Sequence, residues 1–258
     1  MIAWCLGGVG ATTGLAYYVT ATWPLHLSGK VVPAGEATTT QRLEAVDRLV
    51  LFPYLVVVSW LAVRASAGPA WGSFEERWFE SSVVARWCLV LYVTKTFVDL
   101  FAQLATLGKP GAKRVEMIAH HAVSAFCIAH GLHAGVCHFF GCLAIVSEVS
   151  TLFLNGLMAV KLFTGEKTKL QRNLSVLNGL LLWLSYLVVR ILLFPMWFWI
   201  FFSDVASHDV SSVSKVQLVL YPASTLTIFI LSLYWFGLIT SGLIKALLQP
   251  PPNKKKVA

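Results

Sequence analysis

This sequence contains few charged residues. Charged residues make up only 12% of its 258 residues, about half of the roughly 25% that soluble proteins carry. Hydrophobic residues make up 57% and come in long blocks. This composition excludes a disordered chain, a nucleic-acid-binding arm and an ordinary soluble enzyme. We therefore interpret the net charge of +8 as an asymmetry between loops and not as a footprint for nucleic acid.

Metal-binding and secretory patterns are also missing. The five cysteines all fall inside or at the edge of apolar blocks, and no Cys-x-x-Cys pair occurs. We therefore expect small buried side chains, with no metal and no cofactor. The pair His130 and His133 has the spacing of metal ligands but no carboxylate near it in sequence, so this signal is weak. No basic region precedes the first apolar run, so we expect no cleaved signal peptide.

Seven apolar segments are long enough to cross a bilayer core of about 30 Å at about 1.5 Å per residue. They are Ile2–Thr20, Leu49–Ala65, Val83–Leu107, Met117–His133, His138–Val160, Val176–Phe202 and Val216–Leu248. The fourth is short and is followed by a tight link that contains glycine, which predicts a hairpin with the fifth. A connector precedes the second segment, with a short interfacial helix near Thr40–Arg48. The sequence predicts an all-α, polytopic membrane helical bundle of about seven transmembrane helices.

The loops differ in basic charge. Of the 20 Lys and Arg residues, 14 fall in the loops of one side and 4 in those of the other, with Lys95 and Arg190 inside spans. The positive-inside rule then predicts a luminal N-terminus and a cytosolic C-terminus. Lys255 and Lys256 resemble a dilysine endoplasmic-reticulum retrieval signal. The alternative is a basic anchor on anionic lipid, and the plasma membrane is the alternative location.

Ionisable groups inside spans are costly, on the order of 2.5–3.5 kcal/mol each on insertion scales. Tyr92, Thr96 and Asp99 share one face of the third span, and Lys95 lies one turn before Asp99. Two interpretations stay open. Lys95 and Asp99 are either a self-neutralised pair that faces neighbouring helices, or part of the wall of a polar cavity.

The fourth to sixth spans carry further polar groups. His120 and His121 are adjacent in the fourth, and Glu148 shares a face of the fifth with Asn155. We expect Glu148 to be protonated or paired across helices, with Arg190 as its partner. Counted from the cytosolic ends, these groups reach similar depth. The sequence thus predicts one cytosol-facing pocket between the third, fourth and fifth spans.

At these residues the sequence resembles the TLC-domain superfamily, which includes the ceramide synthases and translocation-associated membrane proteins. The resemblance rests on Tyr92–Asp99, on "MIAHHAVSAF" at Met117–Phe126 and on Phe140–Lys161, with Arg190, Pro195 and Tyr234-Trp235 in addition. It runs from about Val46 to Leu248. It implies three parts: a first transmembrane helix with its connector (1–45), a TLC domain (46–248) and a basic cytosolic tail (249–258).

The resemblance is incomplete at the motif of ceramide synthases. The histidine pair of that motif matches His120-His121, but its later His-Asp falls on Ser147-Glu148, so the second histidine is missing. The chain thus looks like the branch outside the ceramide synthases. From the polar positions inside the spans, taken together with the resemblance, we expect catalytic roles for His120, His121, Asp99 and Glu148. We expect binding roles for Tyr92, Lys95, Ser147, Ser150, Thr151, Asn155, Arg190 and Tyr234.

Two functions follow as expectations. The first is a lipid-homeostasis protein of the endoplasmic reticulum that binds or senses acyl lipids in an intramembrane cavity. The second is a ceramide-synthase-like acyltransferase that uses acyl-CoA with an intramembrane histidine. A channel or transporter is a weaker alternative, because no inverted repeat occurs. The expected partners are membrane lipids, with acyl-CoA or a sphingoid base as further candidates and a second copy of the chain as another, but no nucleic acid.

Overall fold

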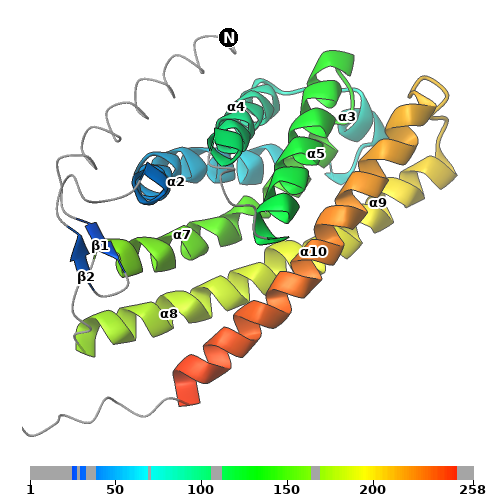
Figure 1. Ribbon diagram of the computed structural model, residues 1–258. Coiled ribbons are helices and arrows are strands. Elements are labelled where there is room, and N and C mark those ends of the chain that lie inside the picture. Colours follow the sequence, from blue (N-terminus) through cyan, green and yellow to red (C-terminus); the bar gives the residue numbers. More distant parts are fainter. Residues whose placement is uncertain are drawn as a thin grey trace, which may run out of the picture.

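The structure, a computed structural model, describes residues 25–27, 30–32, 39–68, 71–105, 112–163 and 169–248. Apart from one small antiparallel ribbon, β1 (Leu25–Leu27) with β2 (Lys30–Val32), these residues form helices (Figure 1). The helices are α2 (Thr39–Ser66), α3 (Phe74–Trp78), α4 (Val83–Ala105), α5 (Ala112–Ala134), α6 (His138–Ile145), α7 (Glu148–Phe163), α8 (Lys169–Tyr186), η2 (Leu187–Leu192), α9 (Leu193–Ser207) and α10 (Lys215–Leu248).

Helices occur where the apolar segments predict them. Six of the seven segments coincide with helices, and the first, Ile2–Thr20, lies outside the described residues. Three described segments are long and apolar enough to cross a membrane: His138–Leu157, Asn173–Ser207 and Lys215–Leu248. α2 adds a shorter apolar stretch, Phe52–Ser66. The chain is therefore a helical membrane protein.

α2 is longer than predicted. The apolar segment that starts at Leu49 and the separate interfacial helix expected before it are one continuous helix of 28 residues. The residues between Thr39 and Arg48 are mostly good helix formers, and neither proline nor glycine separates the two stretches. Nothing in the sequence therefore ends a helix at Arg48.

α5 and α6 form the predicted hairpin around a tight turn. Gly135 and Cys137 both have left-handed backbone conformations, with φ of 72° and 60°. Glycine adopts this conformation freely, but for Cys137 it costs about 1–3 kcal/mol. The Cys137 N–H donates a hydrogen bond of 2.7 Å to the carbonyl of Trp78, at the end of α3. The turn is thus fastened to α3.

α8, η2 and α9 form one long rod, with α10 lying along and across it (Figure 1). η2 is a π-helical stretch, in which the N–H of Leu193 donates to the carbonyl of Val188, five residues back. Pro195 gives a physical reason for it. Proline lacks an N–H, and its ring clashes with the carbonyl four residues earlier in a regular α-helix. The wider π turn accommodates this, and it carries the buried Arg190.

α3 covers one end of the bundle. Trp78 is completely buried, with its ring 5.3 Å from that of Phe140 and 5.0 Å from that of Phe201. Asp204 of α9 accepts hydrogen bonds from Arg77 Nε at 2.7 Å and from Trp78 Nε1 at 2.8 Å. A buried ion pair therefore holds α3 against α9, with the aromatic core beneath it.

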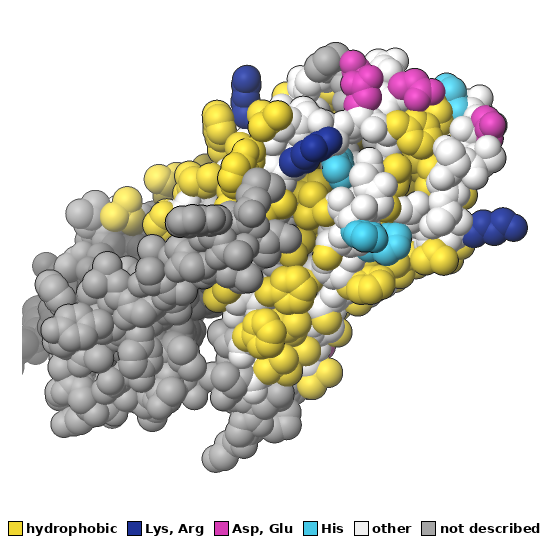
Figure 2. Space-filling model, turned by 90° about the horizontal axis from the view of Figure 1, so that it is seen from above, with side chains coloured by type: hydrophobic (Ala, Val, Ile, Leu, Met, Phe, Trp, Pro, Cys, Tyr) yellow, Lys and Arg dark blue, Asp and Glu magenta, His cyan; other side chains and the backbone are white. Residues whose placement is uncertain are grey.

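The same end of the molecule is acidic. Figure 2 shows acidic side chains gathered at one end, while apolar side chains cover much of the remaining described surface. Glu75 and Glu80 in and beside α3, and Asp209 in the α9–α10 loop, are exposed. Phe74 stacks on His208 with ring centroids 4.2 Å apart, so these two segments lie together.

Candidate functional site

α4 brings a charged pair into the interior of the bundle. Tyr92, Lys95 and Asp99 are all buried. Lys95 Nζ lies 3.0 Å from Asp99 Oδ2, which confirms that these two residues pair along the helix. The other carboxylate oxygen of Asp99 is buried and has no hydrogen-bond partner among the described residues. The pair is neutral as a unit but leaves one acceptor open.

α5 places its two histidines next to this pair. His120 and His121 are both buried, with ring centroids 5.4 Å apart. Trp235 of α10 meets His120 edge to face at 6.0 Å. Nδ1 of His120 is buried and has no partner in the described part of the chain. An unpaired buried polar atom costs about 1–3 kcal/mol, which points to a water or ligand atom at this position.

The turn before α7 and the first residues of α7 place a glutamate and several other polar side chains next to the residues of α4 and α5. Ser147, Glu148, Ser150 and Asn155 are buried, and Thr151 is half-buried. Glu148 interacts electrostatically with Lys95, Arg190, His120 and His121. It is the first residue of α7, where the helix dipole favours a negative charge. We call Lys95, Asp99, His120, His121, Glu148 and Arg190 the polar cluster.

Arg190 does not make the direct contact with Glu148 that the sequence led us to expect. Its Nε donates to Ser150 Oγ at 3.0 Å and its Nη2 to Thr151 Oγ1 at 3.3 Å, with a longer bond of 3.5 Å from Nη1 to Ser232. Ser150 lies two residues after Glu148, so the two side chains leave α7 about 200° apart. With Ser150 turned toward Arg190, Glu148 faces α4 and α5.

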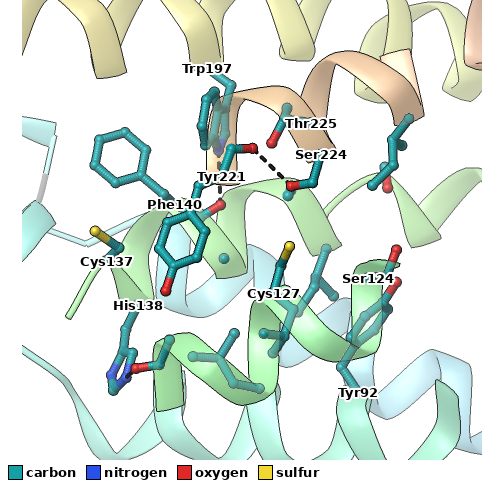
Figure 3. A pocket seen from close by; sticks show the side chains of 18 of the residues that line it. Tyr92, Ser124, Cys127, Cys137, His138, Phe140, Trp197, Tyr221, Ser224 and Thr225 are labelled. Atoms are coloured by element: carbon teal, nitrogen blue, oxygen red, sulfur yellow. Dashed lines mark hydrogen bonds between the residues drawn. The ribbon is translucent and has the colours of Figure 1, made fainter. Parts of the chain in front are cut away.

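Figure 3 shows a cavity of about 70 Å³ from close by. It adjoins the polar cluster, because His120 and Glu148 belong to its wall. One face of α5 lines it with His120, Ser124, Cys127 and Gly131, at spacings of four, seven and eleven residues. The other walls come from α4, α6, the start of α7, α9 and α10. Their apolar side chains include Leu89, Phe140, Phe194, Trp197 and Ile228.

The two ends of the cavity differ. At one end, polar groups are satisfied. His138 Nε2 pairs with the Gly131 carbonyl at 3.2 Å, its Nδ1 pairs with Ser81 Oγ, and the Tyr221 hydroxyl pairs with His130 Nδ1 at 3.0 Å. Figure 3 shows Tyr221 and His138 near one another there. The other end holds His120 and its unpaired nitrogen, and we call it the polar end. The polar end therefore has an unpaired hydrogen-bonding atom, whereas at the far end no buried nitrogen or oxygen in the side chains of the described residues His130, His138 and Tyr221 lacks a partner.

The predicted site residues divide into three groups. Four line the cavity: Tyr92, His120, Ser147 and Glu148. Seven lie outside its wall, buried or half-buried: Lys95, Asp99, His121, Ser150, Thr151, Asn155 and Arg190. Tyr234 is 55% exposed and is not brought to the cluster, whereas its neighbour Trp235 meets His120.

The extent of the cavity also differs from the predicted pocket. The sequence predicts walls from three spans and an opening toward the cytosolic loops. The cavity instead runs along α5 from His120 toward Gly131 and the α5–α6 turn, about 16 Å, with α9 and α10 as further walls. Ser124 and Cys127 were detectable, because they follow His120 on the same helix face. Trp197 and Tyr221 gave no local signal, because only tertiary packing brings them here.

The chemistry available is hydrogen bonding and proton transfer. Among the described residues, no group of three or more His, Cys, Asp or Glu side chains is placed to hold a metal ion. His120 has an open ring nitrogen and interacts electrostatically with the carboxylate of Glu148, so it is a candidate general base. The same pairing also suits the recognition of a lipid head group.

Comparisons with known proteins bear on the family. A family model for the TLC domain matches residues 44–241. This match covers more than two thirds of the chain and includes the whole polar cluster and every residue that lines the cavity. Neither the curated proteins nor the solved structures that were searched contain a match. Together with its membrane-spanning helices, the match shows that the chain belongs to the TLC-domain family, which points to a lipid-related function in a membrane.

Proposed function

We propose that this protein binds or senses an acyl lipid in the cavity beside the polar cluster, as a lipid-homeostasis protein of the endoplasmic reticulum. The supporting observation is the asymmetry of the cavity. Its walls are mainly apolar, and one end presents the unpaired Nδ1 of His120 beside Glu148. A mostly apolar pocket with a few convergent polar groups is the usual form of a site for an amphipathic small molecule.

The size of the cavity bears on how a lipid would enter. A volume of about 70 Å³ is about half that of an engineered cavity of about 150 Å³ that binds benzene, so it suits a head group and the first few carbons. A complete acyl chain therefore requires neighbouring helices to separate. α5 and α10 are the natural pair, because both line the cavity while much of α10 is exposed. We propose that the chain of the lipid lies between these two helices.

The proposed orientation places the Lys- and Arg-rich loops in the cytosol, with seven spans and a luminal N-terminus. His120 is eight residues from the start of α5, about 12 Å from that side. A lipid of the cytosolic leaflet would then present its polar group at His120 and extend its chain toward Gly131. The dilysine signal at Lys255 and Lys256 lies outside the described residues. We propose that it retrieves the protein to the endoplasmic reticulum.

The test is to measure the lipid that purifies with the protein. The purified wild type, His120→Ala and His133→Ala are extracted and their lipids quantified by mass spectrometry, with thermal unfolding followed in parallel. His133 is exposed on the same helix and serves as the matched control. We expect His120→Ala to lose the bound lipid several-fold while its melting temperature stays close to that of the wild type. Equal lipid in His120→Ala and the wild type would refute the proposal.

Acyl transfer is the second candidate, and the open nitrogen of His120 beside Glu148 is the observation that favours it. His120 would take a proton from the amine of a sphingoid base as the amine attacks the carbonyl carbon of an acyl thioester. The carbon–sulfur bond would then break, and His120 would pass the proton to the leaving sulfur, which gives an amide and a free thiol. Expression in cells that lack sphingolipid N-acylation tests this candidate. Restored growth that depends on His120 and not on His133 supports acyl transfer. Failure at normal protein levels leaves lipid binding as the function.

A further inference from the structure

We infer that the polar end of the cavity selects an uncharged head group, a hydroxyl or a carboxamide, over a carboxylate, a phosphate or an ammonium group. This inference rests on the proposed function, because it names the class of lipid that the same cavity takes. It is carried by two observations on described residues: the balance of buried charges around the cavity, and the open hydrogen-bonding position at its polar end.

The buried charges of the polar cluster cancel. Lys95 is matched directly by Asp99 at 3.0 Å. Arg190 and Glu148 do not touch, but they interact electrostatically across the start of α7, and both are buried. The cluster therefore has two cations and two anions. A buried ion without a counter-charge is strongly disfavoured, so a ligand with a net charge would disturb this balance.

The unpaired hydrogen-bonding groups that line the polar end of the cavity are neutral ones, because the open carboxylate oxygen of Asp99 lies outside the cavity wall. Nδ1 of His120 has no partner in the described structure. One turn further along α5, the hydroxyl of Ser124 also faces the cavity, near the Tyr92 hydroxyl but without a fully formed hydrogen bond (Figure 3). A neutral imidazole nitrogen and a hydroxyl together can both accept and donate. A hydroxyl or a carboxamide uses both capacities, whereas a carboxylate only accepts and an ammonium group only donates.

A ligand with a charged head group would require a change in the site. A carboxylate would need a proton to be taken up, most directly by His120. An ammonium group would need a negative charge of its own, because Glu148 already offsets Arg190. Because both changes involve charge, the preference for one head group over another should depend on the net charge of the polar cluster. The preference can therefore be altered by altering that charge, which separates electrostatic selection from a general loss of packing.

The experiment uses four tritium-labelled ligands with one chain and different ends: oleyl alcohol, oleamide, oleic acid and oleylamine. Binding to the purified full-length protein is measured by equilibrium dialysis, with oleic acid at alkaline pH, where it is ionised, and oleylamine at neutral pH, where it is protonated. For the wild type we expect the alcohol and the amide to bind at least about tenfold more tightly than the acid or the amine.

Variants of the polar cluster then change its net charge, and with it the relative affinities of the four ligands. Glu148→Gln leaves one excess cation and should raise the affinity for oleic acid relative to oleyl alcohol. Arg190→Gln leaves one excess anion and should raise the relative affinity for oleylamine. Ser124→Ala should weaken the alcohol several-fold. Ser59→Ala should change nothing, because Ser59 is also a buried serine without a partner among the described residues but lies on α2, outside the cavity wall.

Each outcome supports or overturns the head-group inference, and the outcomes separate it from the proposed lipid-binding function. Preference for the neutral ligands, with opposite shifts in the two charge variants, supports the inference. Wild-type protein that binds the acid or the amine as tightly as the alcohol overturns the inference but leaves lipid binding intact. Equal weakening of all four ligands by Glu148→Gln and Arg190→Gln also overturns it, because it shows a structural role only. If none of the four binds, the proposed function fails together with the inference.

Discussion

Arg190 Nε donates its hydrogen bond to the hydroxyl of Ser150, 3.0 Å away, so a buried cation is held by neutral oxygens while its counter-charge, Glu148, lies further off. Such an arrangement makes the two charges interdependent without direct contact. Removal of either one leaves the other buried and uncompensated, and the resulting loss of stability can be measured.

Loss of Arg190 should destabilise the fold. Arg190→Met removes the cation and leaves Glu148 unbalanced, so we expect a loss of about 3–5 kcal/mol. Thermal unfolding in detergent, followed by tryptophan fluorescence, measures it. The double variant Arg190→Met with Glu148→Gln should recover part of this loss, because both charges are then gone. Arg86→Met, at an exposed position, is the control. No recovery in the double variant would show that the two charges are not coupled.

Asp204 should be essential for the attachment of α3. Asp204→Ala removes the carboxylate that offsets the buried charge of Arg77, and we expect a loss of about 3–5 kcal/mol in the free energy of unfolding. Trp78→Phe removes one hydrogen bond to the same carboxylate and should cost less, about 1 kcal/mol from this bond. Asp209→Ala, at an exposed acidic residue nearby, should be neutral. Proteolysis at the α3 segment gives an independent measurement, and equal resistance in Asp204→Ala would contradict the proposed role.

Gly141 keeps the cavity open. A Cβ atom at this position would lie 2.9 Å from Leu89 Cδ2 and 3.2 Å from Ile128 Cδ1, and all three residues line the cavity. Gly141→Ala should therefore push Leu89 into the cavity, at a cost of about 1–3 kcal/mol, and weaken lipid binding.

The control for this variant is Gly242→Ala. Nothing lies within 4 Å of a Cβ at Gly242 of α10, so this change should be neutral or stabilise the helix by up to about 1 kcal/mol. Leu89→Ala combined with Gly141→Ala should restore binding, because the displaced side chain is shortened. If Gly141→Ala binds lipid as the wild type does, the cavity is not the site.

The membrane orientation predicts opposite sides for two positions. A cysteine introduced at the exposed Asp209, between α9 and α10, should be labelled only from the lumen. A tag after Ala258 should be reached by antibody once the plasma membrane alone is permeabilised. A tag that stays inaccessible under these conditions would overturn the proposed orientation.

Retrieval by the C-terminal lysines makes a separate prediction. Replacing Lys255 and Lys256 with serine should move the protein from the endoplasmic reticulum toward the Golgi apparatus or cell surface. Imaging against markers of both compartments measures this redistribution. Replacing Lys245, in the last turn of α10, is the control for loss of positive charge alone. A double variant that remains reticular would show that the tail is only a surface anchor.

The positions of the longer helices could be predicted from the sequence because each contains a long apolar block, and such a block has few alternatives to a helix in a membrane. The five-residue helix α3 was not predicted, because Phe74–Trp78 contains no such block. The continuation of α2 through Arg48 does not follow from hydropathy, because the chain changes there from a polar to an apolar stretch while the helix continues. The β1–β2 ribbon was missed because three-residue strands carry almost no periodic signal. The π-helix was missed because its cause, Pro195, acts on the turn before it.

The candidate site was predictable in its residue types and less so in its geometry. Lys95 and Asp99 are four residues apart, so their pairing follows from helix geometry alone. The partners of Arg190 depend on how α7 is rotated, which no local pattern fixes. The same holds for Tyr221 and Trp197, which reach the cavity only through the packing of α10 and α9 against α5 and α6.

The π-helical stretch η2 limits how many residues the chain can have between α8 and α9. Because η2 fits one extra residue into a turn, α8 and α9 are out of phase by about 100° compared with a regular helix. Deleting a single residue between Leu187 and Val189 would bring them back into phase and rotate Arg190 relative to the aromatic face of α9. In this part of the chain, an insertion or deletion of one residue is therefore less tolerable than most substitutions. Among relatives, conserved length here would mark those that keep the buried cation.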